Sequence, residues 1–388
     1  MISDLLNSKT ILARDRSPWV DYIKGICIIL VCFRHVYEGL LSVTTVPPSS
    51  ETLDYLNLFF FSFRMPLFFI VSGLFLAPSF NKLGFNGYFK QRVQTIFYPF
   101  VVWGVLHISL QLLFKDYVNA NREPYDYLRL FFRPRAIEQF WYLNALFFVG
   151  VLYAVFKRYA RFNIVHQLVL GLVLYTVAAL FNRYKIEGGF LYDVFFFYLF
   201  FAIGDLLSSF VLDKENVKLF SSYKLLFIIL PFFLVLQHYF TSISFDKGDD
   251  YYVQRFMPFL FILAALIGGA FIVSIAFILQ KKNWLRFLRV VGYHSLYIYV
   301  ANLMVTSATR VVLYRVLHVE NIYILLFVGI VSGVLIPMLM YGIAQKAGAW
   351  WLYTLKKPVA TTSAKVAVKQ SETFEKSVPK AVVRNINH

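Results

Sequence analysis

Residues 20–35 read VDYIKGICIILVCFRH, an apolar run with a lysine near its start and an Arg-His pair at its end. The run has the character of a membrane-spanning helix, which needs about 20 apolar residues. Ionisable side chains in hydrocarbon are costly, so they need partners, a water-filled cavity or a function. Lys24 and His35 are eleven residues apart. This spacing is close to three helical turns, which predicts one shared face and about 16 Å along the axis. Asp21 and Glu38 fall near the same face, so this helix predicts an interior polar site.

The composition is that of a polytopic membrane protein. Hydrophobic residues make up 59% of the chain and charged residues 15%, whereas soluble domains carry about 25% charged residues. The formal charge of +17 is also typical of nucleic-acid-binding proteins. We exclude that class, because the Lys and Arg residues lie between apolar segments and in the tail, where membrane topology places them. The two cysteines, Cys27 and Cys32, point to different helix faces and predict small buried side chains without a disulfide framework.

Ten apolar segments have about the 20-residue length that crosses the hydrocarbon. The fold class that we predict is therefore all-α, a polytopic membrane helix bundle of about ten transmembrane helices. The apolar pattern is interrupted near 311–321. The predicted spans are 22–42, 55–78, 95–114, 140–157, 165–181, 190–210, 223–241, 256–280, 290–310 and 322–345.

Loop charge predicts that both termini are cytoplasmic. In that orientation 24 Lys and Arg residues lie inside and eleven outside, as the positive-inside rule requires. The connection 115–139 is an exception, because it holds five basic residues on the predicted outside. The loop 43–54 has no Lys or Arg, so we expect it, Ser49 included, to be external. The predicted divisions are a cytoplasmic N-terminal segment at 1–20, a membrane domain at 21–350, and a basic, disordered cytoplasmic tail at 351–388.

His35 is the first candidate catalytic residue. A neutral imidazole can take a proton from a hydroxyl or a thiol near pH 7. Glu38, one turn further on, is placed to orient the imidazole or balance its charge, whereas Arg34 points about 100° away and predicts a separate contact. The alternative is a histidine that only hydrogen-bonds a neighbouring helix. The ionisable groups that share the face favour the functional interpretation.

Arg64 is the second candidate and lies in the stretch RMPLFFIVSG, within the second predicted span. A guanidinium group there can bind a phosphate or carboxylate through two parallel hydrogen bonds. Pro66 frees backbone groups that a cavity can use. The alternative is an arginine that extends to the membrane interface.

Two further segments carry polar groups into predicted spans. The first, EQFWYLN, includes Glu138 and Trp141; its alternative is a plain loop acid followed by an aromatic belt. The second, GYHSLYIYVAN, ends at Asn302, and helix–helix hydrogen bonding is its alternative.

These residues resemble the motifs of the acyltransferase 3 family of integral membrane acyltransferases, in the order in which that family has them. The resemblance covers roughly residues 15–350, with ten spans as in the family. The matching stretches are Lys24 to His35 for a basic-x10-His motif, Arg64 to Gly73 for an Arg, paired-Phe and Ser-Gly signature, Arg92 to Pro99 for a basic-to-Tyr-Pro entry, and Phe140 to Leu143 for an aromatic start of a later span.

The chain departs from the family pattern at Asn302. The late segment of the family commonly ends in Ser…Ile-Tyr-x-x-His, and Asn302 stands at the corresponding position. A role for a second histidine is therefore in doubt here. We also expect a stand-alone membrane domain, without the extracytoplasmic hydrolase-like domain that some members carry.

The resemblance implies an enzyme, an acyltransferase that transfers groups other than aminoacyl groups. The expected activity is O-acylation, O-acetylation first of all, of a hydroxyl of a cell-surface or secreted glycan, such as an exopolysaccharide or its lipid-linked precursor. The expected donor is cytoplasmic acyl-CoA, with acetyl-CoA the first choice, and no cofactor is bound permanently. Further expected partners are membrane lipids and polysaccharide biosynthesis proteins, with no nucleic acid. The location implied is the bacterial inner, or cytoplasmic, membrane.

The resemblance also assigns roles to residues. Direct transfer with His35 as base is favoured, and a relay through an acyl-enzyme at Ser72 stays open. No metal site is expected. The expected catalytic residues are His35, Glu38 and Arg64, and the expected substrate-binding residues are Asp21, Lys24, Arg34, Ser72, Arg92, Glu138, Trp141 and Asn302.

Two other classes of protein stay open. A transporter or flippase also places polar groups inside a bundle, although such proteins usually show inverted repeats, and no repeat stands out in this sequence. A non-catalytic component of an exopolysaccharide assembly machine is the other class, and Asn302 is the residue that keeps it open.

Overall fold

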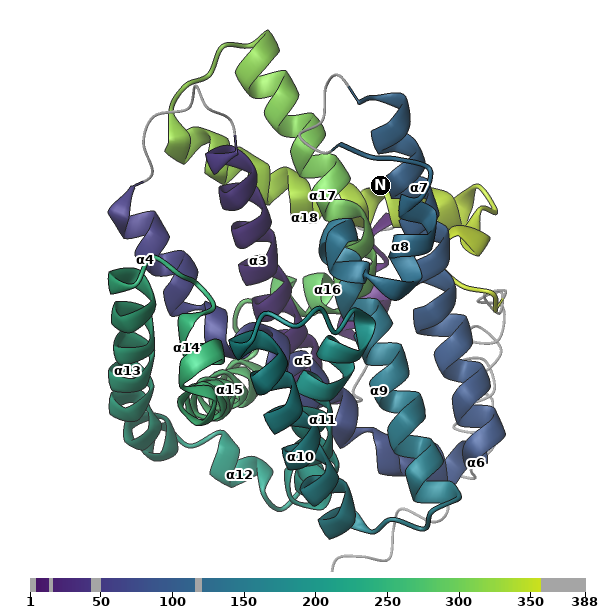
Figure 1. Cartoon of the computed structure of the whole chain (residues 1–388), viewed down its shortest axis with the longest axis vertical. Coiled ribbons are helices and arrows are strands. Elements are labelled where there is room, and N and C mark those ends of the chain that lie inside the picture. The colour runs from purple at the N-terminus through teal and green to yellow at the C-terminus, as the bar shows by residue number, and fades with distance from the viewer. Residues whose placement is uncertain (1–4, 14–16, 43–49, 116–120, 357–388) are drawn as a thin grey trace, which may run out of the picture.

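The structure is a computed structural model that describes residues 5–13, 17–42, 50–115 and 121–356. Within these ranges every regular element is helical, and the helices pack into one bundle (Figure 1). The prediction of an all-α, polytopic bundle is therefore confirmed.

The helices follow one another with short connections. The first half contains α2 (Ser8–Leu12), α3 (Pro18–Leu41), α4 (Glu51–Phe59), α5 (Phe61–Leu74), α6 (Leu76–Arg92), the π-helix η1 (Val93–Phe97), α7 (Tyr98–Leu113), α8 (Asp126–Phe132), the 3-10 helix η2 (Pro134–Phe140), α9 (Trp141–Arg158) and α10 (Ile164–Arg183). The second half contains α11 (Phe190–Val211), α12 (Val217–Phe220), α13 (Tyr223–Asp246), α14 (Tyr252–Phe256), α15 (Pro258–Lys282), α16 (Phe287–Tyr293), α17 (Ser295–Arg310), the π-helix η3 (Val311–Val316), α18 (Ile322–Lys346) and the 3-10 helix η4 (Trp350–Leu352).

Ten helical stretches of the described residues have the length of a membrane span. One is α3, a 24-residue helix that holds the charged residues of the opening motif. The other nine are long and apolar enough to cross a membrane: Glu51–Leu74, Leu76–Leu113, Pro134–Arg158, Ile164–Arg183, Phe190–Val211, Tyr223–Asp246, Pro258–Lys282, Ser295–Val316 and Ile322–Lys346.

Helix α3 lies among other helices rather than at the edge of the bundle. It packs against α5, α15, α16, α17 and α18 (Figure 1). The contact with α16 is backbone to backbone: a Cβ atom on Gly292 would lie 1.8 Å from the carbonyl oxygen of Asp21, and one on Gly25 would lie 2.3 Å from that of Leu288. Any larger residue at either glycine would push α3 away from α16. The position of α3 along its own axis is therefore set by this contact.

Two boundaries differ from the sequence prediction. The connection between the second and third spans is helical, because α6 continues through η1 into α7, with a break at Gly84 where φ is +66°. Aromatic side chains hold this segment in place: Phe85 lies 5.3 Å from Tyr159, and Phe89 lies 6.2 Å from Phe147, as ring centroid distances. The interruption predicted at 311–321 begins later than expected, because residues 311–316 form η3 and extend α17.

The arginines of the basic connection 115–139 have acidic partners. Four of them form ion pairs among the described residues. The amino group of the fifth basic residue, Lys115, is in none of the ion pairs of the described residues. The pairs are Arg122–Glu138 at 2.9 Å, Arg129–Asp126 at 3.0 Å, Arg133–Glu187 at 2.7 Å and Arg135–Asp193 at 2.7 Å.

Contacts between connections define two ends of the bundle, which we call the α3 C-terminal end and the α3 N-terminal end. The α3 C-terminal end gathers the connections around residues 121–140, 184–189 and 247–257, through the pairs Arg133–Glu187, Arg34–Asp250 and Arg255–Asn182. The α3 N-terminal end gathers Trp19 with Gln280, Lys157 with Asp205, and Ser208 with Leu74. Residues 43–49, with Ser49, and the tail from residue 357 lie outside the described ranges, so the predictions for them are not tested.

Candidate active site

A cavity of about 90 Å³ opens toward the α3 C-terminal end of the bundle. Its lining comes from α3, α5, η2, α9, α11, α14, α15 and α17, which are far apart in the sequence. The side chains at its mouth are exposed, as for Arg135 at 38%, whereas Arg64 within it is 2% exposed. The polar lining residues are Arg34, His35, Arg64, Arg135, Tyr251, Gln254 and Tyr299. We call this the arginine cavity.

Helix α3 contributes Arg34 and His35 side by side. Arg34 Nε lies 2.6 Å from Glu38 Oε1, and Arg34 Nη2 lies 3.5 Å from Asp250 Oδ2. Arg34 Nη1 is buried and has no hydrogen-bond partner. The Glu38 carboxylate thus pairs with the arginine one turn before it, where a charge-assisted bond is available, and its role toward His35 stays a prediction.

His35 lines a second cavity as well. This smaller space, of about 20 Å³, lies between α3, α17 and α18 and is also lined by Gly39, Thr306, Ser307 and Arg310. No ion pair or hydrogen bond of the described residues uses the His35 ring. The imidazole thus stands between two cavities with its nitrogens available for a ligand.

Arg64 reaches the arginine cavity from α5. Its Nη1 atom donates to the carbonyl oxygen of Leu30 at 3.2 Å, while Nη2 is buried without a partner. The Cζ atoms of Arg64 and Arg34 lie 5.4 and 4.7 Å from the centroid of the same ring, that of Phe61. At 2% exposed, the Arg64 side chain is enclosed by the protein. None of the ion pairs of the described residues includes Arg64.

Arg135 and Trp141 form another wall of the cavity. The guanidinium group of Arg135 donates two hydrogen bonds to Asp193 Oδ1, from Nη2 at 2.7 Å and from Nε at 3.0 Å. Its Cζ atom also lies 4.5 Å from the centroid of the Trp141 ring. Sequence reasoning named Trp141 but missed Arg135, whose partner Asp193 is 58 residues away.

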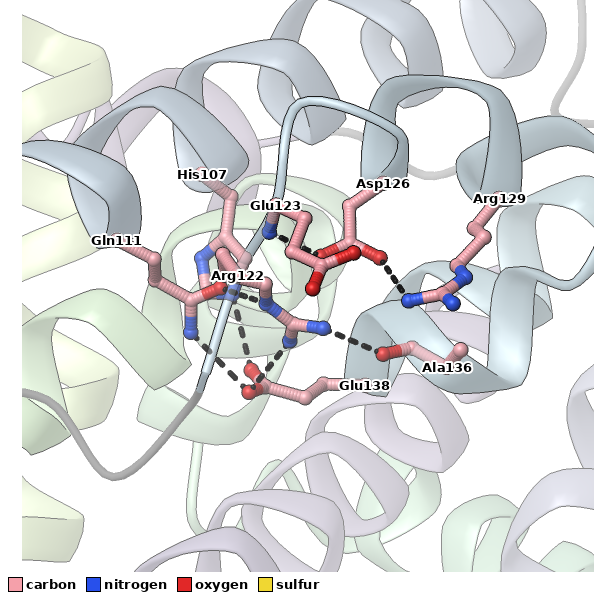
Figure 2. A network of polar contacts seen from close by, with 8 residues as sticks. All are labelled: His107, Gln111, Arg122, Glu123, Asp126, Arg129, Ala136 and Glu138. Atoms are coloured by element: carbon pink, nitrogen blue, oxygen red, sulfur yellow. Dashed lines mark hydrogen bonds and ion pairs between the residues drawn. The ribbon is translucent and has the colours of Figure 1, made fainter. Parts of the chain in front are cut away.

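Glu138 lies between these two wall residues in the chain, and Figure 2 shows the polar network around its carboxylate. Its carboxylate accepts hydrogen bonds from Gln111 Nε2 at 3.1 Å and Arg122 Nη2 at 2.9 Å, and lies 2.9 Å from His107 Nε2. Arg122 also donates to Gln111 Oε1 at 2.7 Å and to the carbonyl oxygen of Ala136 at 2.6 Å. Both carboxylate oxygens therefore have protein partners, and the role of Glu138 in substrate binding stays a prediction.

The backbone at Glu138 is held in an unusual conformation. Its φ of +53° lies in the left-handed region, which costs energy for a residue other than glycine. The network around its side chain over-determines that conformation. The turn directs Arg135 and Trp141 toward the cavity, and the next carbonyl, that of Gln139, accepts a hydrogen bond from the Tyr299 hydroxyl.

Three expected residues lie toward the α3 N-terminal end instead. Asp21 and Lys24 belong to the first two turns of α3 and line neither cavity. Arg92, at the end of α6, donates from Nε to the Tyr88 hydroxyl at 2.8 Å and is near enough to Lys24 for the two charges to interact. Lys24 and Arg92 thus make a second basic site, separated from His35 by about 16 Å along α3.

Ser72 and Asn302 also line neither cavity. Ser72 lies eight residues after Arg64 on α5, about 12 Å along the helix.

Asn302 is completely buried, and neither atom of its amide has a partner. It lies one turn after Tyr299, which lines the arginine cavity. Gln139 has the same unpartnered, fully buried amide and was missed by sequence reasoning. Buried amides without partners are costly, which favours a polar ligand or water near them.

The fold and the site together define a class: a polytopic helical membrane protein with a buried, arginine-lined cavity and an unengaged imidazole. Residues 17–342 match the acyltransferase domain family known as acyltransferase 3, and the chain belongs to that family. The match covers all the spans that hold site residues.

One curated relative is an inner membrane protein, YcfT of Escherichia coli (strain K12). It is 31% identical over 163 residues, which are 38% of this chain and 46% of the relative. The chain thus matches about half the length of that relative. No solved structure matches the chain.

Proposed function

We propose that the protein is a membrane O-acyltransferase that transfers an acyl group, acetyl in the first instance, from cytoplasmic acyl-CoA to a hydroxyl of a surface or secreted glycan or its lipid-linked precursor. Membership of the acyltransferase family supports the reaction class. The observation that carries the site assignment is the placement of His35. Its ring lies between two cavities, beside an arginine with an unpartnered guanidinium nitrogen.

The proposed chemistry is direct transfer. His35 takes the proton of the acceptor hydroxyl as its oxygen attacks the thioester carbonyl carbon. The tetrahedral intermediate carries a negative oxygen, which the positive field of the arginine cavity stabilises. The carbon–sulfur bond then breaks, and the CoA thiolate receives the proton from the imidazolium. Every proton and bond is accounted for without a co-reactant.

The structure disfavours the acyl-enzyme relay. Ser72 lies about 12 Å further along α5 than Arg64 and lines neither of the two cavities. A serine nucleophile would need the base within hydrogen-bond reach. We therefore propose the one-step route, with His35 as the base.

The donor is proposed to enter from the α3 N-terminal end. Lys24 and Arg92 lie there and can pair with the phosphates of CoA. CoA carries its phosphates and its thioester at opposite ends of a long flexible arm. The separation of about 16 Å between Lys24 and His35 suits that layout. With the orientation that loop charge predicts, this end is cytoplasmic, and an inner membrane location is in line with the name of the relative.

The experiment is the release of free CoA thiol by purified protein given acetyl-CoA and a glycan acceptor, for wild type and His35→Ala. General-base catalysis contributes about 10²–10⁴-fold, so His35→Ala should lose nearly all release. Equal detergent-extracted yield and equal thermal stability control for misfolding. Equal CoA release by both proteins, or release by neither with any acceptor tried, contradicts the proposal.

A transporter or flippase gives a different result in the same assay. It would move glycan or lipid across a vesicle membrane without consuming acyl-CoA. A non-catalytic assembly component would do neither. Glycan movement without release of CoA thiol would therefore favour the transporter class.

A further inference from the structure

We infer that the arginine cavity binds an anionic group of the acceptor, so that the glycan acylated by this protein carries a carboxylate or phosphate close to the reacting hydroxyl. This inference rests on the proposed function and names its substrate class. It adds a binding site for the acceptor at the α3 C-terminal end, distinct from the basic site at Lys24 and Arg92.

The first step is the charge of the cavity. Arg34 and Arg135 are balanced by acids, at 2.6 Å from Glu38 for Arg34 and at 2.7 Å from Asp193 for Arg135. Arg64 is 2% exposed and forms no ion pair among the described residues; Glu38 and Asp250, which pair with Arg34, act on it only from beyond ion-pair distance. A buried guanidinium group without a direct partner is costly unless an anion joins it. Arg64 is therefore the group of the cavity with which an anion can pair.

The second step is the geometry of the donors. Arg64 Nη2 and Arg34 Nη1 are both buried without hydrogen-bond partners. Both guanidinium groups pack on Phe61, with their Cζ atoms 5.4 and 4.7 Å from its centroid. Two N–H donors from neighbouring helices, α3 and α5, suit the two oxygens of a carboxylate or phosphate.

The third step separates the acceptor from the donor. The mouth of the arginine cavity lies among the connections of the α3 C-terminal end, where Arg135 and Asp250 are exposed at 38% and 39%. The basic site suited to CoA phosphates lies about 16 Å away toward the other end of α3. An anion that enters past Arg135 therefore belongs to the other substrate.

The fourth step is the rest of the lining. Trp141 and Phe61 supply apolar surface to the lining, while Tyr251 and Gln254 offer polar groups to the hydroxyls of a sugar. A mostly apolar wall with a few polar groups is typical of ligand pockets. His35 lines the same cavity, so a sugar held by its charged group can present a hydroxyl to the imidazole.

The test is acceptor selectivity. Purified protein receives acetyl-CoA with one of three acceptors: a glucuronic-acid oligosaccharide, the same oligosaccharide with its carboxylates reduced to alcohols, or a phosphorylated neutral oligosaccharide. We expect a charged acceptor to have a KM at least about tenfold below that of the reduced one, the value of one charge-assisted hydrogen bond. The carboxylate and phosphate arms distinguish the two sources of charge.

Variants locate the effect. Arg34→Gln should raise the KM for the charged acceptor and shrink its advantage over the reduced acceptor. The matched control is Arg133→Gln, which removes the same charge from a 60% exposed side chain at the same end of the bundle. Arg133→Gln should keep the selectivity. An advantage that is equal in all three proteins contradicts the inference.

Binding without turnover separates this inference from the proposed function. The thermal unfolding temperature is measured with the glucuronic-acid oligosaccharide alone, and then with added CoA. A rise that survives saturating CoA supports a separate acceptor site, even for a protein that transfers nothing. A rise that CoA abolishes by competition shows that the cavity holds donor phosphates, and the inference is then wrong. Transfer to neutral and charged acceptors with equal KM overturns the inference while leaving the proposed function in place.

Discussion

Replacement of Arg64 by lysine should remove most of the acyl transfer while the protein still folds. The arginine is 2% exposed, donates from Nη1 to the Leu30 carbonyl at 3.2 Å, and keeps Nη2 for a ligand. The ammonium group of lysine keeps the charge, but it lacks the planar guanidinium group whose two nitrogens can bind the Leu30 carbonyl and a ligand at the same time. Loss of one charge-assisted hydrogen bond costs about 1.5–3 kcal/mol, which corresponds to a fall in kcat/KM of about 10- to 150-fold.

The assay is CoA thiol release from acetyl-CoA at saturating and limiting acceptor, with thermal unfolding of each protein measured in the same detergent. Arg133→Lys is the matched control, because Arg133 forms a 2.7 Å pair with Glu187 but is 60% exposed. Exposed pairs contribute about 0–1 kcal/mol, so this control should transfer at the wild-type rate.

Two results would refute the reasoning on Arg64. Arg64→Lys protein at normal levels and with wild-type kcat/KM would show that the second guanidinium nitrogen is not used in the reaction. If Arg64→Lys lowers both kcat/KM and the unfolding temperature, and the loss of activity is explained by the fraction of unfolded protein, the arginine acts through folding alone.

Three further predictions concern the network, the packing and the orientation. Glu138→Gln should lower the free energy of unfolding by about 1–3 kcal/mol, because Arg122 and His107 lose a charged acceptor. The unfolding temperature of this variant should therefore fall. An unfolding temperature equal to that of the wild type would contradict the stabilising role of the network. Gly292→Ala should abolish the yield of folded, detergent-extracted protein, since its Cβ would lie 1.8 Å from a backbone oxygen of α3. Gly269→Ala, whose Cβ would be 3.5 Å from its nearest neighbour, is the control that should fold. In a version without its two cysteines, Glu187→Cys should react with an impermeant maleimide in intact cells, and Lys214→Cys only after permeabilisation; the reverse pattern would invert the orientation.

The fold was largely predictable because hydropathy carries it. Long apolar stretches such as Pro258–Lys282 are long and apolar enough to cross a membrane. Helix boundaries were harder to predict where the local sequence pattern and the tertiary packing disagree. Residues 76–92 are too polar to be recognised as part of a span, yet aromatic contacts with α9 keep α6 helical up to η1.

The site was predictable in part, for reasons that lie in single residues. His35 and Arg64 are recognisable because a charged group inside an apolar run is costly wherever it lies. Arg135 was missed because its neighbours mark a basic loop, and its partner Asp193 comes from a different helix. Spacing allowed both His35 and Arg34 as partners of Glu38, and in the structure Glu38 pairs with Arg34 at 2.6 Å. Thr306 and Arg310 could not be linked to His35, because their shared cavity exists only where α3, α17 and α18 meet.

The backbone contact of Gly25 and Gly292 makes α3 a fixed spacer. With one point of the helix clamped against α16, every later residue of α3 has a set height and a set direction. Deleting one residue between Lys24 and His35 would turn the imidazole by about 100° and draw it back by about 1.5 Å, away from both cavities. Substitutions along this stretch can be absorbed by neighbouring side chains, but a change in its length cannot. The count of ten residues between the lysine and the histidine is thus a mechanical requirement of the bundle.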